Sequence, residues 1–152
     1  PAHSILRSIP TGCNSVRLVL SPSGDRAYVT VRAEDALLIF DTAKLTGDTT
    51  GVRVARVSVG TSPVGVAVVD SGRRVIVTNS NRFGGGANDD QVLTVIDVSQ
   101  GGGAAPTVLG NVPAGAFPRE MRVSHDGRTL FLTNFNSKNI EMIDLARLPI
   151  RK

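Results

Sequence analysis

The chain has 152 residues, about the length of one domain, and 41% of them are hydrophobic, 20% charged and 4% aromatic. This apolar content is too high for a disordered chain, and the 16 glycines lack the strict period of a collagen. The single cysteine, Cys13, excludes a disulfide within the chain, and we expect it to be a small packed residue rather than a nucleophile.

The net charge of +4 comes from 14 arginines and 3 lysines set against 13 acidic residues. These charges are spread along the chain without a run of five like charges, so a dedicated nucleic-acid surface is not indicated. No apolar run approaches the ~20 residues of a membrane-spanning helix. The first residues lack the basic and apolar regions of a signal peptide, although a mature secreted protein would begin in the same way.

Internal repetition dominates the sequence. Three stretches align from glycines that are 48 and 55 residues apart, namely Gly12, Gly60 and Gly115. Three further sets of markers keep the same steps: Ser15, Pro63 and Pro118; Gly24, Gly72 and Gly127; Thr30, Thr78 and Thr133. Four markers in one register predict a repeat architecture.

Short strands joined by glycine-containing turns are predicted throughout, because Val, Ile, Leu, Thr and Phe dominate the runs between turn residues. In chain order the predicted strands are residues 5–10, 16–21, 27–31, 36–41, 54–59, 64–69, 75–79, 93–98, 107–112, 120–125, 130–134 and 140–145. Helix signals are poor, and only residues 41–45 and 144–148 could form a single turn. The second repeat carries eight additional residues within 79–91.

Several predicted strands, such as residues 75–77 and 130–132, are apolar on both faces. A strand that is buried on both sides belongs to a sheet stacked between two other sheets. Four-stranded sheets that repeat every ~40–50 residues and stack face to face are the blades of a β-propeller. The predicted fold class is therefore all-β, a β-propeller segment of three four-stranded antiparallel blades.

Residues 72–79 (GRRVIVTN), 127–134 (GRTLFLTN) and, less fully, 24–30 (GDRAYVT) resemble the YVTN repeat of bacterial and archaeal β-propellers. Members of this family are usually seven-bladed and are often called YncE-like or lactonase-like. They include exported and cell-surface proteins, so the resemblance implies a periplasmic or extracellular location.

The expected blades cover residues 12–59, 60–114 and 115–152, and residues 1–11 supply the outer strand of a neighbouring or closing blade. Three blades alone cannot close a ring. The expected partners are therefore other blades, which come either from the rest of a longer chain or from a second copy by strand exchange. The open flanks would otherwise expose large apolar faces.

Propeller topology places the loop before the innermost strand and the loop between the second and third strands on the face around the channel mouth. The eight-residue insertion lies in such a loop and offers Arg82 as a ligand contact and Asp89 and Asp90 as weak metal candidates. The alternative is a flexible surface excursion, because a calcium site needs ~6–8 oxygen ligands. No cofactor is indicated.

Arg119 and Glu120 open the innermost strand of the third repeat on the same face, and Arg17 occupies the position of Glu120 in the first. The segment resembles a P-R-H/E segment of lactonase-like propellers. The resemblance implies that Arg119 orients an anionic substrate and that Glu120 acts as a base or metal ligand. Alternatively, the pair lines a polar, solvated channel. Asp41, Asp97 and Asp144 recur in every blade, so we expect them to serve the blade through turn hydrogen bonds.

The favoured function is a non-enzymatic binding or scaffold module for a small anionic ligand or a protein partner. Its contacts would come from the channel-mouth residues Arg17, Arg82, Arg119 and Glu120. The alternative is a lactonase-like hydrolase of sugar lactones that uses Arg119 and Glu120. Binding of single-stranded nucleic acid is a third interpretation, and it is weakened by the scarcity of aromatic residues for base stacking.

Overall fold

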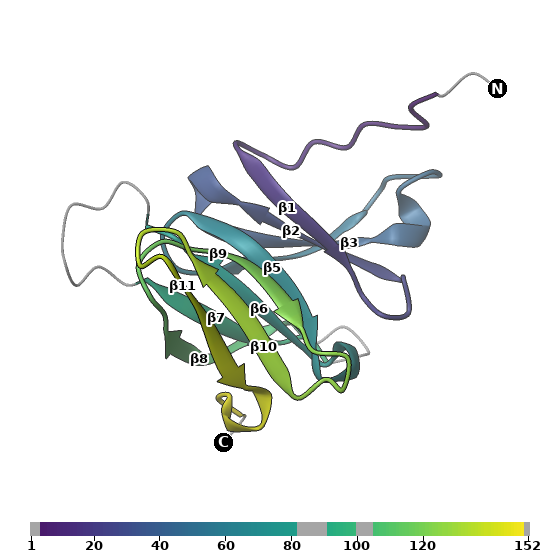
Figure 1. Ribbon diagram of the computed structural model, residues 1–152. Helices are drawn as coiled ribbons and strands as arrows, with labels where there is room; N and C mark the ends of the chain where they lie inside the picture. The colour runs from purple at the N-terminus through teal and green to yellow at the C-terminus, as the bar shows by residue number, and fades with distance from the viewer. Residues whose placement is uncertain (1–3, 82–90, 100–104, 151–152) are drawn as a thin grey trace.

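The computed structural model describes residues 4–81, 91–99 and 105–150 (Figure 1). Within these ranges the strands form three antiparallel sheets, each of which follows the chain in order. The first sheet contains β1 (Ser15–Leu20), β2 (Arg26–Val31), β3 (Ala36–Asp41) and β4 (Arg53–Ser58). The second contains β5 (Pro63–Val69), β6 (Arg74–Asn79), β7 (Val92–Asp97) and β8 (Thr107–Pro113). The third contains β9 (Pro118–Val123), β10 (Thr129–Asn134) and β11 (Asn139–Asp144).

The three sheets are the predicted repeats, and their first strands lie side by side. β5 is next to both β1 and β9, so the second sheet stands between the other two (Figure 1). Strands β1, β5 and β9 are therefore the innermost strands of three blades. No helix within the described ranges is long and apolar enough to cross a membrane.

Apolar side chains fill the two spaces between the sheets, as the strands with two apolar faces predicted. Between the first and second sheets, Tyr28, Leu37 and Ile39 pack in one cluster with Val75 and Val77. Between the second and third sheets, the buried cluster consists of Ala67, Val69, Ile76, Leu93, Val95, Met121, Leu130, Leu132, Leu145 and Leu148. The second sheet is thus buried on both faces, which is the condition that makes its strands uniformly apolar.

The glycine turns and the recurring aspartates perform the local roles that the repeat predicted. Gly24, Gly72 and Gly127 have φ angles of 75°, 93° and 70°, a region that glycine enters without steric cost. The carboxylates of Asp41, Asp97 and Asp144 each accept a backbone N–H two residues further on, at 2.9–3.0 Å. The single-turn helices η2 (Thr42–Lys44) and η4 (Leu145–Arg147) follow the first and last of these aspartates, as expected, and η1 (Arg32–Glu34) and η3 (Asp70–Gly72) occupy two further turns.

Serine hydroxyls hold a carboxylate in the turns of the first and third blades. Asp25 accepts hydrogen bonds from Ser23 and Ser21 at 2.5 and 2.7 Å, and Asp126 accepts one from Ser124 at 2.5 Å. These hydrogen bonds lower the pKa of Asp25 and of Asp126 because they favour the ionised form. Both carboxylates therefore have a structural role, which is to stabilise the turns in which they lie.

The recurring threonine connects the first sheet to the second and the second to the third. Thr30 Oγ1 accepts the backbone N–H of Arg17 at 3.1 Å and donates to the carbonyl of Val64 in β5 at 2.9 Å. Thr78 Oγ1 repeats the arrangement, with the N–H of Gly65 at 2.6 Å and the carbonyl of Arg119 in β9 at 3.5 Å. The N–H groups are freed by a register shift between the first two strands of each blade. The threonine side chain thus gives a hydrogen-bond partner to the N–H group that the register shift leaves unpaired. The same side chain holds two neighbouring blades at a defined spacing.

One expectation about the N-terminal part needs correction, and another stays a prediction. Cys13 is exposed rather than packed, because it lies in the turn ahead of β1, where its backbone N–H donates to Glu34 at 3.1 Å. Residues 5–10 form no strand within the described chain, and their assignment to the outer strand of a neighbouring or closing blade stays a prediction. Ile9 in this segment packs against the buried apolar face of the first sheet that includes Val29 and Phe40.

We predict that Thr30→Val lowers the free energy of unfolding by about 1–3 kcal/mol, because the partly buried N–H of Arg17 and the buried carbonyl of Val64 both lose a partner. Chemical denaturation provides the measurement. Thr129→Val is the matched control, since this half-buried strand threonine makes no side-chain hydrogen bond to the described residues, and its effect should stay within about 0.5 kcal/mol. If both variants lose the same free energy of unfolding, the hydrogen bonds of Thr30 do not stabilise the fold.

Candidate functional site

The loops before the innermost strands and after the second strands meet on one face, as propeller topology predicted. In each blade a residue with positive φ precedes the innermost strand: Asn14 (63°), Ser62 (52°) and Phe117 (58°). The carbonyl of this residue accepts a backbone N–H from the loop after the second strand, donated by Arg32 at 3.0 Å, Ser80 at 3.1 Å and Phe135 at 2.9 Å. Three equivalent hydrogen bonds therefore build the rim of the channel-mouth face.

Phe117 departs from this pattern in its side chain. A bulky residue in the left-handed region costs about 1–3 kcal/mol, whereas asparagine enters it more readily. Phe117 is held there by burial and by its backbone N–H, which donates to Gln91. Its ring packs edge-on against Phe135, with centroids 5.5 Å apart and an interplanar angle of 71°. The strained residue thus presents a fixed aromatic surface at the mouth of the third blade.

Arg119 lies over this aromatic surface. Its guanidinium carbon is 5.0 Å from the centre of the Phe117 ring, which is a cation–π distance. Among the residues that the structure describes, no carboxylate forms an ion pair with Arg119. Among the described residues the guanidinium is therefore oriented by an uncharged aromatic partner, and its N–H groups make no hydrogen bond to them.

Glu120 is engaged by two arginines from different blades. Its Oε2 atom lies 3.3 Å from Nε of Arg17, which is 103 residues earlier in the chain, in β1. Its Oε1 atom accepts a hydrogen bond from Arg122, two residues further along β9. The Arg17 and Glu120 side chains are 45% and 37% exposed, so this ion pair orients side chains more than it stabilises the fold.

Gly65 makes the contact between the first and third blades sterically possible. It occupies, in β5, the position that Arg17 has in β1 and Glu120 has in β9. A Cβ atom at Gly65 would lie 2.2 Å from the carbonyl oxygen of Arg119 and 2.9 Å from Oγ1 of Thr78. The missing side chain lets β5 and β9 approach closely and leaves the space in front of β5 to the Arg17–Glu120 pair.

Sequence reasoning anticipated part of this cluster. The structure brings Arg17 and Glu120 into contact and places Arg119 at the rim, whereas Arg82, Asp89 and Asp90 lie outside the described residues. Arg122, Phe117 and Phe135 were not predicted as site residues. The available signal for Arg122 was its position two residues after Glu120, which puts both on the same face of a strand.

The described side chains do not form a recognisable metal site. Within the ranges that the structure describes, no group of three or more His, Cys, Asp or Glu side chains is arranged to hold an ion. Asp89 and Asp90 are outside those ranges.

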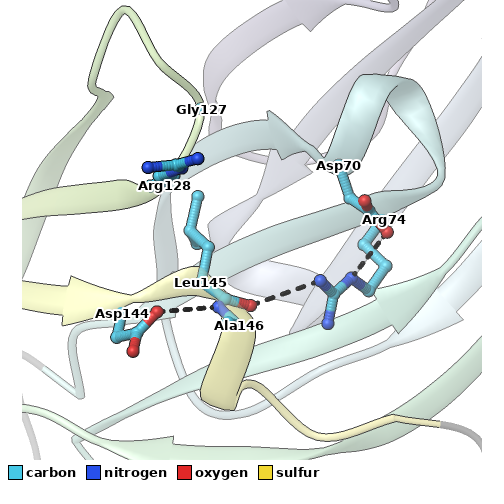
Figure 2. Close-up of a pocket in the computed structure, with 7 residues that line it drawn as sticks. All are labelled: Asp70, Arg74, Gly127, Arg128, Asp144, Leu145 and Ala146. Atoms are coloured by element: carbon cyan, nitrogen blue, oxygen red, sulfur yellow. Dashed lines mark hydrogen bonds and ion pairs between the residues drawn. The ribbon is translucent and has the colours of Figure 1, made fainter.

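A groove of about 310 Å³ opens at the opposite end of the blades, between the second and third sheets (Figure 2). Three of the charged side chains that line it, those of Asp70, Arg74 and Asp144, make structural contacts. Arg74 lies with Nε 3.3 Å from Asp70 and donates to the carbonyl of Leu145 at 3.3 Å, and Asp144 accepts the N–H of Ala146 at 2.9 Å. Arg74 therefore connects the two sheets here, and the channel-mouth cluster is the better candidate site.

We predict that Gly65→Ala lowers the free energy of unfolding by about 1–3 kcal/mol, the usual cost of overpacking, because the new methyl group collides with the carbonyl oxygen of Arg119 in β9. Thermal or chemical denaturation tests this. Gly47→Ala serves as the control, since a Cβ there has no neighbour within 4 Å. If Gly65→Ala is as stable as Gly47→Ala, the close approach of β5 and β9 is not a constraint on the fold.

Comparisons with known proteins identify the fold without identifying a family. No protein-family model matches the sequence, and no curated protein matches it significantly. One similar structure is a protein of Bacteroides fragilis named as a putative 6-phosphogluconolactonase. It is 16% identical to this chain, with a TM-score of 0.73, and the match covers 91% of this chain and 36% of the Bacteroides chain. The periplasmic gluconolactonase PpgL of Pseudomonas aeruginosa is 21% identical with a TM-score of 0.68, over 89% of this chain and 36% of its own.

A third similar structure is named for its architecture. The β-propeller domain of Cps50 (Swd1) from Myceliophteria thermophila is 11% identical with a TM-score of 0.65, over 91% of this chain and 42% of its own. This chain thus spans less than half the length of each of these three proteins. At these identities the similarity defines the fold alone. The chain has the all-β fold of a β-propeller and contains three of its blades.

Proposed function

We propose that this chain is the three-blade part of a binding module whose channel-mouth face takes a small anionic ligand through Arg119. The observation that carries the proposal is the placement of Arg119, whose guanidinium is oriented by the Phe117 ring and pairs with no described carboxylate. A guanidinium offers five N–H donors in a planar fork that matches a carboxylate or a phosphate.

The neighbouring charges support the same ligand class. Arg17 and Arg122 flank the single carboxylate of Glu120, so the cluster together with Arg119 has two more positive than negative charges. Such an excess on a partly exposed face attracts anions, and salt screens this attraction. The repeated GRRVIVTN and GRTLFLTN segments further support our proposal that the blades are of the YVTN type.

A lactonase-like hydrolase is the second candidate, because two of the similar structures are named as gluconolactonase-type proteins. In this interpretation Glu120 would act on the substrate that Arg119 orients. Both oxygens of Glu120 are, however, occupied by Arg17 and Arg122. The two guanidinium groups hold the carboxylate within the cluster, where a substrate would have to share it with them, and this geometry favours binding over catalysis.

We predict that the chain binds 6-phosphogluconate, which carries two anionic groups, and does not bind glucose measurably. Isothermal titration calorimetry at low ionic strength is the measurement. Arg119→Gln should weaken binding by about 10-fold or more, as expected for a lost charge-assisted hydrogen bond.

Arg128→Gln is the matched control, because it removes the same charge from the groove on the far face. Added salt should weaken binding to the wild type. Equal losses from Arg119→Gln and Arg128→Gln would mean that the net charge attracts the anion and that the rim does not bind it specifically.

For the second candidate, we predict that the chain does not accelerate the hydrolysis of glucono-δ-lactone above its spontaneous rate. A pH-stat assay measures this directly. An acceleration that is lost in Glu120→Gln and kept in Arg128→Gln would overturn this prediction and make the hydrolase the better assignment.

A further inference from the structure

The short linker that leads from one blade into the next is held by the preceding blade. Asp35 lies directly before β3, the third strand of the first blade. Its backbone carbonyl accepts the N–H of Val59 at 2.9 Å, and its Oδ1 atom accepts the N–H of Ser62 at 2.8 Å. A single residue therefore clamps both ends of the linker 59–62, which joins β4 to β5.

Gln91 forms the same clamp in the second blade, where it lies directly before β7. Its backbone carbonyl accepts the N–H of Ala114 at 3.1 Å, and its Oε1 atom accepts the N–H of Phe117. The linker 114–117 joins β8 to β9, and its first and last residues are the ones that bind Gln91. The two clamp residues differ in type, but each offers a side-chain oxygen that accepts a hydrogen bond.

The linker into the third blade is held along its whole length. The N–H of Gly115 donates to Oε2 of Glu141 at 3.2 Å, and the N–H of Ala116 donates to Oγ of Ser137 at 2.7 Å. With the two hydrogen bonds to Gln91, all four N–H groups of this linker have a partner in the second or third blade. Residues of two blades thus define the path of the backbone into β9.

Phe117, the last residue of this linker, has the greatest need of the clamp. Its φ of 58° is unfavourable for a bulky side chain, whereas the equivalent residue of the other clamped linker is the small Ser62. The next residue is Pro118, and a residue before proline favours the extended region. A Phe117 that loses its hydrogen bond to Gln91 is therefore expected to relax toward an extended conformation.

The backbone conformation of Phe117 decides where its ring lies, and the ring orients the guanidinium of Arg119. The residue is buried, with 5% of its surface exposed, and the guanidinium carbon of Arg119 is 5.0 Å from the centre of the ring. A change of φ at Phe117 would turn the ring away from this position. Two contacts in series, Gln91 with Phe117 and Phe117 with Arg119, thus connect the second blade to the candidate site.

We propose that Gln91 is a positioning residue of the anion site. Its side-chain oxygen keeps Phe117 in the left-handed conformation, and the ring of Phe117 then holds the guanidinium of Arg119 in place for the ligand. The second blade thereby sets the affinity of a site whose ligand-binding arginine belongs to the third. This inference rests on the proposed binding of an anion by Arg119.

Isothermal titration calorimetry with 6-phosphogluconate tests this role. Gln91→Met keeps the length of the side chain and removes the acceptor oxygen, so it should weaken binding by about 3-fold or more, as expected when a cation–π contact is lost. Asp35→Leu is the matched control, because it opens the equivalent clamp ahead of a strand that has Val64 at the position of Arg119. It should not weaken binding, and equal weakening in both variants would overturn the proposal.

A double-mutant cycle tests whether Gln91 acts through Phe117. Phe117→Leu keeps a buried apolar side chain and the N–H that donates to Gln91, but it removes the aromatic ring. It should weaken binding about as much as Gln91→Met does. Adding Gln91→Met to it should cause little further loss, because both changes remove the same contact. Losses that multiply in the double variant would show that the two residues act independently and would overturn the proposal.

Nuclear magnetic resonance of the chain without ligand gives a second, independent measurement. The coupling between the amide proton and Hα of Phe117, together with its backbone chemical shifts, should report a positive φ in the wild type. The same result is expected for Gln91→Glu, which keeps an acceptor oxygen as Asp35 does. In Gln91→Met they should report an extended conformation. A Phe117 that keeps its positive φ in Gln91→Met would overturn the role of the clamp.

The two kinds of measurement separate this inference from the proposed function. If the wild type binds 6-phosphogluconate and Phe117 relaxes in Gln91→Met while the affinity stays the same, the positioning role is wrong and anion binding by the rim stands. If the wild type binds no 6-phosphogluconate, the proposed function is wrong, and the positioning role of Gln91 is overturned with it.

Discussion

Each sheet of this chain is apolar on both faces, and this single constraint determines the rest of the structure. A sheet with two apolar faces must be covered twice, so the second sheet exists only between the first and the third, with Ile76 and Val77 fully buried on opposite sides. Stacking alone would leave the sheets free to slide. The recurring threonine prevents this, because its hydroxyl links an irregular innermost strand to the backbone of the following one.

The candidate site is a consequence of the same stacking. Side-by-side innermost strands bring Arg17 and Glu120 together although they are 103 residues apart, and Gly65 leaves the space between them. The rim adds Phe117, a strained aromatic residue that orients Arg119. The channel-mouth face thus carries the arginine cluster, whereas on the opposite face Arg74, held beside Asp70, joins the second and third sheets through the carbonyl of Leu145.

Most of the fold could be predicted from the sequence. Four sets of markers in one register identified the repeats, and the glycines of the turns and the recurring aspartates predicted local conformations that depend on neighbouring residues only. The site was predicted in part. Arg17, Arg119 and Glu120 could be assigned to the channel-mouth face from their position in the repeat, but their partners could not, because ion pairs join side chains from different blades.

The sequence by itself determined the number of repeats, the strand order within each and the face on which each loop lies, because these follow from period, turn residues and strand alternation. Only the tertiary structure decided what each repeated position does. Thr30 and Thr78 connect two sheets because a following sheet is present. Phe131 is exposed and Ile76 is buried, although both occupy the same position in the repeat. The physical reason is that burial depends on the neighbouring blade, and a repeat carries no information about whether that neighbour is there.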